Sequence, residues 1–195
     1  VSVSPKYLID ELAIAENSLS KKSEFLTKYA CVKQNSSLAW LDIQTIKSMC
    51  GKELKLEDFA HSYCVAGIDL SMSTDLTAAV IVVEKEGELY CFAHFWLPSE
   101  KIEEAISRDG LPYQQYIARG FLSLSGENYI DYNDCYKWLV DIVERYEILP
   151  LVVGYDRYSA NYLINDLKAY GFVTDDVYQG DNLYGVLQEM EGFMK

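Results

Sequence analysis

Two short apolar segments that each end in an aspartate place the strongest constraint on the fold of this chain. The first is Ala66-Gly67-Ile68-Asp69-Leu70-Ser71, and the second is Leu151-Val152-Val153-Gly154-Tyr155-Asp156. Nearly unbroken apolar runs of this length are typical of central strands that are covered on both faces. If two such strands are parallel neighbours, their carboxyl ends meet at one edge of the sheet, and the aspartates meet there too. The sequence therefore predicts an oxygen site for a divalent metal such as Mg²⁺ or Mn²⁺.

The hydrophobic period predicts an α/β fold with a mixed sheet. Strands are expected at 65–70, 77–84 and 89–97, and the tight connections between them predict an antiparallel meander. A strand–helix–strand crossover then makes later strands parallel. The remaining elements expected are helices at 98–110, 113–120, 133–146, 159–170 and 183–194, and strands at 151–155 and 172–179. Three antiparallel strands followed by parallel strands, flanked by helices, are the expected architecture.

Residues 1–60 are predicted to form a helical linker. Ser4 suits a helix N-cap and Pro5 the first helical position. Further short helices are expected at 24–29 and 42–50. Three short helices bury too little apolar surface for a core of their own. The polar stretch 51–57 is the expected boundary, so residues 61–195 are predicted to form the globular domain.

The charge of the chain works against nucleic-acid binding. Thirty acidic residues against seventeen basic residues give a net charge of −13. If DNA is the substrate, a metal ion or another domain must therefore supply positive charge. Five cysteines, an odd number without a CxxC spacing, argue against a zinc site and against a disulfide framework. This use of cysteine is typical of proteins in a reducing cytoplasm. No signal peptide and no apolar run of transmembrane length are seen, so no membrane partner is expected.

Three aspartates and one arginine are the candidate site residues. Asp69 and Asp156 are the expected metal ligands, because two facing carboxylates repel each other unless a cation lies between them. Asp75, in the polar loop after the first strand, is a third candidate, with a cap or turn role as the alternative. For Asp69 the alternative is a turn residue, and for Asp156 a helix start or an ion pair with Arg157. Arg157 is the candidate DNA contact.

An ordered set of segments resembles the nuclease domain of large terminase subunits from tailed double-stranded DNA bacteriophages. Gly67-Ile68-Asp69-Leu70-Ser71, followed by Asp75-Leu76-Thr77-Ala78, resembles the opening strand of that domain. Gly120-Phe121-Leu122, with Gly126 and Ile130-Asp131-Tyr132, is similar to the linker before a helix in that family. Tyr155-Asp156-Arg157-Tyr158-Ser159-Ala160 is similar to its second acidic strand, and Gln179-Gly180 to the step beyond the next strand. The resemblance covers residues 61–195.

The resemblance implies an RNase H-like fold and an endonuclease that cuts concatemeric viral DNA with two Mg²⁺ or Mn²⁺ ions. It implies that Asp69 and Asp156 bind metal and that Asp75 is an auxiliary acid. Residues 1–60 would be the tail of an ATPase domain and its linker. A further metal-binding acid would lie beyond Lys195, so this fragment is expected to bind metal weakly and to be weak or inactive as a nuclease. In the full-length protein, the implied partners are double-stranded DNA, the small terminase subunit and the portal, in the host cytoplasm at the procapsid.

Two other functions stay open at this point. The chain lacks the phosphate loop of a packaging ATPase, because the GxxxxG at 180–185 is not followed by Lys-Ser/Thr, so no ATPase activity is expected. One alternative is a non-catalytic phage docking module with the same fold, which the acidic charge and the missing last acid favour. The other is a fragment of an actin-like ATPase or sugar kinase, whose first strand also reads Gly-Ile-Asp-Leu but continues into a glycine-containing phosphate loop.

Overall fold

A computed structural model describes residues 4–16, 19–29, 41, 43–50, 53–71, 75–156, 161–178, 180 and 183–194. The chain forms two compact units. One comprises residues 55–180, and the other comprises residues 1–54 together with 181–195. The boundary expected between residues 60 and 61 stays a prediction.

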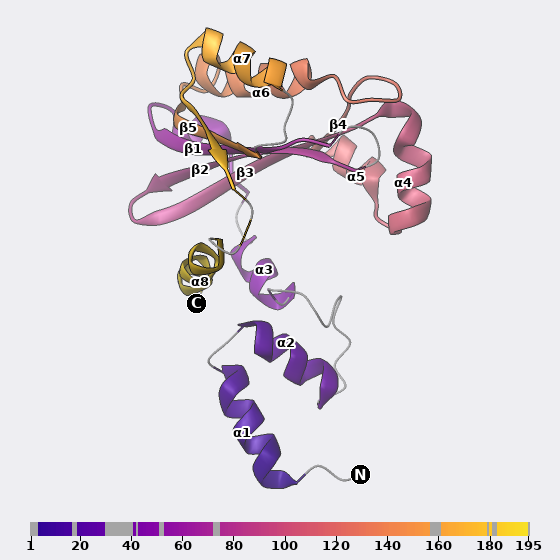
Figure 1. Cartoon of the computed structure of the whole chain (residues 1–195), viewed down its shortest axis with the longest axis vertical. Helices are drawn as coiled ribbons and strands as arrows, with labels where there is room; N and C mark the ends of the chain where they lie inside the picture. The colour runs from indigo at the N-terminus through magenta and orange to yellow at the C-terminus, as the bar shows by residue number, and fades with distance from the viewer. Residues whose placement is uncertain are drawn as a thin grey trace. The chain divides into compact units, whose positions relative to one another are not determined.

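The unit of residues 55–180 is built on a six-stranded mixed sheet with the strand order β4-β3-β2-β1-β5-β6 (Figure 1). The antiparallel meander consists of β1 (Tyr63–Asp69), β2 (Thr77–Lys85) and β3 (Glu88–Leu97). The strand β5 (Leu149–Asp156) pairs in parallel with β1, and β6 (Thr174–Val177) pairs in parallel with β5. The predicted mixed sheet is confirmed, including the central pair of parallel strands.

One strand is absent from the sequence prediction. β4 (Leu122–Leu124) pairs in parallel with the end of β3, through the partners Phe95–Leu122 and Leu97–Leu124. Three residues are too few to show a hydrophobic period. Leu122 falls in the segment that resembles a linker before a helix, and pairing with β3 makes residues 122–124 the sixth strand of the sheet.

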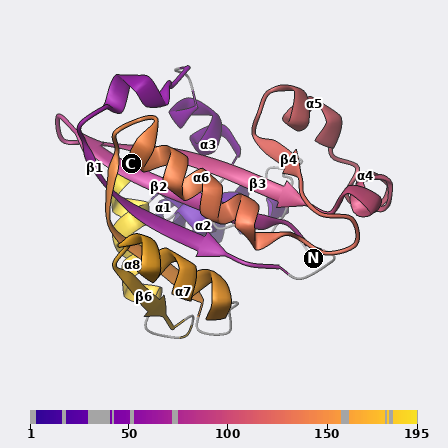
Figure 2. The ribbon, with the colours of Figure 1, turned by 90° about the horizontal axis from the view of Figure 1, so that it is seen from above.

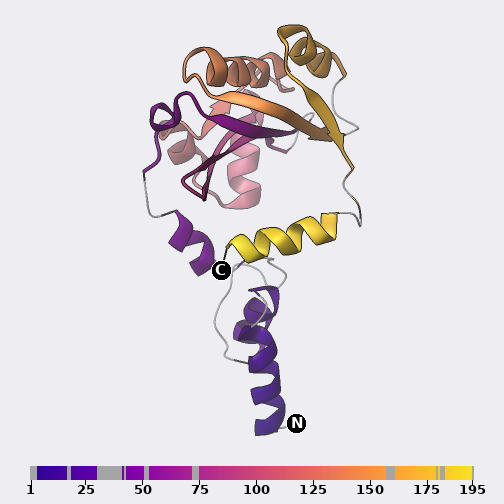
Figure 3. The same ribbon diagram turned by 90° about the vertical axis from the view of Figure 1, so that its left-hand side faces the viewer.

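Helices α6 and α7 cover one face of the sheet, as Figures 2 and 3 also show. Gly171, with a φ of 118°, follows α7 and ends it as predicted. The helices expected in this unit are all present, although their bounds differ by a few residues. They are η2 (Ser99–Lys101) with α4 (Ile102–Asp109), then α5 (Tyr113–Ala118), α6 (Tyr132–Glu144) and α7 (Asn161–Tyr170). The short helix η1 (Leu56–Phe59) is an addition that the sequence did not predict.

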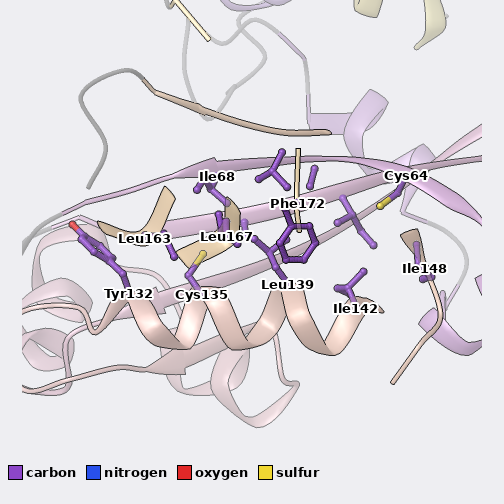
Figure 4. Packing of buried hydrophobic residues seen from close by; sticks show 14 of the residues in the cluster. Cys64, Ile68, Tyr132, Cys135, Leu139, Ile142, Ile148, Leu163, Leu167 and Phe172 are labelled. Carbon is purple, nitrogen blue, oxygen red and sulfur yellow. The ribbon is translucent and has the colours of Figure 1, made fainter. Parts of the chain in front are cut away.

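The main core lies between these two helices and the sheet. Figure 4 shows Cys135, Leu139 and Ile142 pointing from α6 toward the strands, and all three are fully buried. On β1, burial alternates: Cys64, Ala66 and Ile68 face this core. The intervening Tyr63 and Val65 are 62% and 49% exposed. The expectation of a central strand is confirmed, but the expected cover on both faces is wrong for this part of β1.

The other unit contains α1 (Pro5–Glu16), α2 (Leu19–Lys28), α3 (Ile43–Met49) and α8 (Leu183–Phe193). The backbone N–H of Tyr7 donates a hydrogen bond to Ser4 Oγ over 3.3 Å, so the predicted N-cap is confirmed, with Pro5 as the first helical residue. Within the described ranges, no helix combines the length and the hydropathy that crossing a bilayer requires.

His94 on β3 gives the stability of the sheet a predicted pH dependence. Its ring lies 4.7 Å from that of Trp96, and its Nε2 is 2.9 Å from Ser123 Oγ on β4. Burial lowers the pKa of His94, partly offset by a hydrogen bond involving the Gly120 backbone. The unfolded chain therefore binds a proton more readily, and we expect the folded state to lose stability as the pH falls below about 6.5. Melting temperatures of the wild type and of His94→Gln, compared from pH 8 to pH 5, should diverge at the acidic end. Parallel pH profiles would contradict this role of His94.

Candidate functional site

The two predicted ligands occupy the carboxyl ends of neighbouring parallel strands. Asp69 is the last residue of β1 and Asp156 is the last residue of β5. The preceding residues, Ile68 and Tyr155, are partners in the β1–β5 register. Each aspartate is thus one step beyond the same registered pair, on strands about 4.8 Å apart, and both side chains leave the same face of the sheet. The adjacency on which the metal hypothesis depends is therefore present.

Small residues lie beside both carboxylates in the sheet. Asp69 is paired across the antiparallel side with Ala78, and Asp156 is paired with Val177. Two residues back along the strands, on the same face, Gly67 and Gly154 are partners of each other. Valine side chains partly fill the space beside these glycines, because a Cβ at Gly67 would lie 3.4 Å from Val80 Cγ1 and a Cβ at Gly154 would lie 3.1 Å from Val177 Cγ2. Asp69 is exposed and Asp156 is partly buried, so solvent reaches the pair.

Asp75 lies between β1 and β2, two residues before β2 begins. It is exposed, and its backbone N–H donates a hydrogen bond to Ser71 Oγ over 3.2 Å. Such a contact fits the turn role as well as a position near the strand end. Its role as a third ligand stays a prediction. Arg157, the candidate DNA contact, lies outside the described residues.

Arg108 is a second arginine whose charge interacts with one of the candidate acids, Asp75. Arg108 on α4 binds Asp109 through Nε at 2.7 Å and through Nη2 at 3.0 Å, and Tyr113 donates a hydrogen bond to the same carboxylate over 2.7 Å. These contacts lower the pKa of Asp109 to about 2. They also raise the pKa of the Arg108 guanidinium, and the charge of Asp75 contributes to that increase. Arg108 is thus a fixed cation within electrostatic reach of the candidate site.

A hydroxyl network behind the aspartates is absent from the sequence prediction. The Ser71 N–H donates to Thr77 Oγ1 over 3.0 Å, and the Thr77 hydroxyl is 3.2 Å from the Ser71 carbonyl oxygen. Tyr132, at the start of α6, donates to that same carbonyl over 2.9 Å. Thr77 is fully buried and Tyr132 is 7% exposed. The only signal in the sequence is a threonine at an inward position of an apolar strand, and its partners are not evident without the fold.

The start of α6 is itself fixed by polar contacts. Asp131 caps the helix by accepting a hydrogen bond from the Asn133 N–H over 3.0 Å. The backbone N–H of Asp131 donates to Ser125 Oγ over 3.1 Å, and that hydroxyl is 2.8 Å from Asp134 Oδ2. Ser125 is 2% exposed. Tyr132 therefore projects from a well-defined point of the structure.

The donor set fits a hard divalent cation. Carboxylate oxygens are the ligands that Mg²⁺ and Mn²⁺ prefer, and Mg²⁺ commonly uses only one or two carboxylates and completes its shell with water and phosphate oxygen. Across the described part of the chain, no three His, Cys, Asp or Glu side chains come together as a metal-binding group. The protein thus offers a pair of acids rather than a complete cage.

Neither Cys64 on β1 nor Cys135 on α6 is suited to act as a nucleophile. Burial raises the pKa of the Cys64 thiol to about 11 and that of Cys135 to about 12. Thiols with such pKa values are protonated at neutral pH and are poor nucleophiles. Both side chains belong to the core under α6 and α7.

Comparison with known proteins identifies similar sequences and a similar fold. The family described as "Terminase large subunit, endonuclease domain" matches residues 6–194. The large terminase subunit of Enterobacteria phage HK97 is 29% identical over 107 residues, which are 54% of this chain and 21% of that protein. The large terminase subunit of Lactococcus phage p2 is 25% identical over 186 residues, or 94% of this chain and 33% of that protein.

A solved structure confirms the architecture. The crystal structure of the HK97 large terminase superposes with a TM-score of 0.65 at 24% identity, over 77% of this chain and 31% of that one. The chain therefore has the fold of that protein's matching region. It spans between a fifth and a third of the length of the relatives described here.

Proposed function

Because this chain belongs to the family of terminase large subunit endonuclease domains, we propose that it is a metal-dependent endonuclease that cleaves concatemeric double-stranded viral DNA. The observation that supports this proposal most is the pair of acids, Asp69 and Asp156, at the ends of two parallel strands in register. Two-metal hydrolysis of the phosphodiester is the mechanism that we propose, with Mg²⁺ or Mn²⁺.

The residues of the chain have separate tasks in this mechanism. Asp69 and Asp156 hold the metal, and Asp75 supports them from the loop. When bound, a divalent ion supplies Lewis-acid polarisation of the phosphate and lowers the pKa of an attacking water. Gly67, Gly154 and Ala78 are the small residues beside these acids, where we expect the sugar-phosphate backbone to approach. Arg157 is proposed to contact a DNA phosphate.

Electrostatics explain why the metal is needed for binding as well as for chemistry. The chain carries a net charge of −13, so DNA is repelled at long range. Cations between the two aspartates remove the local repulsion where the scissile phosphate must approach. In the full-length protein, other domains, the small terminase subunit and the portal would hold DNA near this site in the host cytoplasm.

Cleavage of supercoiled plasmid tests the proposal directly. With MnCl₂ or MgCl₂, the purified chain should convert supercoiled DNA to nicked and linear products, and excess EDTA should stop the reaction. Products ending in 3′-hydroxyl and 5′-phosphate are expected for attack by water. A preparation that binds Mn²⁺ but leaves plasmid intact at all metal concentrations would contradict the nuclease assignment.

One other function is favoured by a specific observation. The described residues provide no group of three metal-binding side chains, and the chain is strongly acidic, as a non-catalytic phage docking module would be. Such a module should bind partner proteins without a divalent ion and should not cut DNA. The plasmid experiment separates the two. The family match over residues 6–194 argues against an actin-like ATPase or a sugar kinase.

A further inference from the structure

Outside the two aspartates, the residue that is most firmly tied to the candidate site is Ser71. Its N–H, carbonyl oxygen and hydroxyl all take part in hydrogen bonds, with Thr77, Tyr132 and the backbone of Asp75. Ser71 lies two residues beyond Asp69 and four before Asp75. The β1 ladder with β2 ends at Asp69, so hydrogen bonding within the sheet does not fix the chain beyond it. The contacts at Ser71 provide the next fixed point.

We propose that Tyr132 is a positioning residue, which holds the Ser71 carbonyl and thereby sets the metal-binding carboxylate of Asp69. This inference rests on the proposed function, and it adds a residue from α6 to a site built from β1 and β5. Asp69 is held on one side by the β1–β5 register at Ile68 and on the other by the bonds at Ser71. Asp69 itself pairs with Ala78 on β2, and Ser71 keeps its bonds to Thr77, so loss of the Tyr132 bond weakens this second anchor and lets the carboxylate move more.

The geometry of Tyr132 suits this task. Its hydroxyl reaches across 61 positions in the sequence, so it links the strand end to a different element of the fold. The phenol is 7% exposed, and its ring lies 5.8 Å from that of Tyr162. Burial raises the pKa of Tyr132, with a smaller effect from Tyr162, so the hydroxyl stays protonated and donates at neutral and mildly alkaline pH. The capped start of α6 fixes the position from which it donates.

A conservative substitution removes only this hydrogen bond. Tyr132→Phe keeps the ring and its contact with Tyr162 but loses the donor to Ser71. Supporting groups of metal ligands are commonly worth about 10- to 100-fold in metal affinity or activity. We expect Mn²⁺ binding, measured by isothermal titration calorimetry, to weaken about tenfold, and kcat to fall by a similar factor, with KM for DNA unchanged.

Tyr170→Phe is the matched control. Tyr170 lies at the far end of α7 and donates one hydrogen bond, over 3.1 Å, to Glu144 at the end of α6. The Tyr170→Phe variant therefore loses a tyrosine hydroxyl from the same pair of helices, at a position away from the strand ends that carry the acids. Both variants should keep their melting temperature within about 4 °C of the wild type. Mn²⁺ binding and kcat should be unchanged in Tyr170→Phe.

Thr77 provides a second test that does not depend on Tyr132. Thr77→Val removes the hydroxyl that bonds both the N–H and the carbonyl of Ser71, whereas Thr77→Ser keeps it. We expect Mn²⁺ binding to weaken in Thr77→Val and to recover in Thr77→Ser. Equal Mn²⁺ affinity in both Thr77 variants, or in Tyr132→Phe and Tyr170→Phe, would overturn the inference. Failure of the wild type to bind Mn²⁺ at all would instead overturn the proposed function.

Discussion

Replacement of Asp69 by asparagine is expected to reduce Mn²⁺-dependent DNA cleavage by roughly a thousandfold, equivalent to about 4 kcal/mol of transition-state stabilisation. The reason is local. Asp69 is one of two acids at the meeting point of β1 and β5, and asparagine keeps its size but removes the negative charge that holds a cation. Rates of plasmid nicking at saturating MnCl₂ measure the effect.

The same variant should respond differently to metal when it is heated. In the wild type, Mn²⁺ at about 100 times its Kd should stabilise the fold by about 2.7 kcal/mol, which raises the melting temperature by roughly 5–10 °C. Asp69→Asn should lose most of this increase. Without metal, the variant should be at least as stable as the wild type, because a like-charge pair has been removed.

Asp166→Asn is the matched control for charge. Asp166 is exposed on α7 and belongs to neither of the strands that carry the two acids. The substitution makes the same change in net charge, so it should leave cleavage and the Mn²⁺-induced rise in melting temperature unchanged. If Asp166→Asn and Asp69→Asn cleave DNA equally well, the metal site is not at the end of β1.

Leu139→Ala is expected to have the largest effect on stability, with a loss of about 3–4 kcal/mol in the free energy of unfolding. Leu139 is 0% exposed at the centre of α6 and belongs to the core that joins this helix to the sheet (Figure 4). Removal of three carbon atoms there leaves a cavity that rigid neighbours fill only in part. Urea unfolding followed by circular dichroism measures the change.

An exposed leucine in the same unit provides the comparison. Leu89 on β3 is 55% exposed, so Leu89→Ala should change the free energy of unfolding by no more than about 0.5 kcal/mol. Similar losses in the two variants would mean that α6 does not pack on the sheet as described. That result would also remove the support for Tyr132, which begins the same helix.

Much of the sheet could be predicted from the sequence because its strands are regular. The β-branched run after Asp75, the turn at Glu86 and Gly87, and the apolar segment before Asp156 each carry a local signal. Together with the handedness and direction of crossovers, they place β1 beside β5. The three-residue β4 carries no such signal, because its hydrogen bonds come from the end of β3.

The candidate site was predictable in one respect and not in another. Aspartates that end apolar strands are visible in the sequence, so Asp69 and Asp156 could be named in advance. The network of Ser71, Thr77 and Tyr132 could not, because a hydroxyl shows its partner only when the chain is folded. The roles of Asp69 and Asp156 as metal ligands stay predictions, and so do those of Asp75 and Arg157, which depend on where a loop carries each side chain.

Diffraction from a crystal soaked in MnCl₂ tests the central claim most directly. We expect an anomalous peak between the carboxylates of Asp69 and Asp156, within coordination distance of an oxygen from each. We also expect the peak to vanish in crystals of Asp69→Asn. A peak elsewhere on the protein with none at this pair, or carboxylates that turn away from each other in the presence of the metal, would contradict the claim.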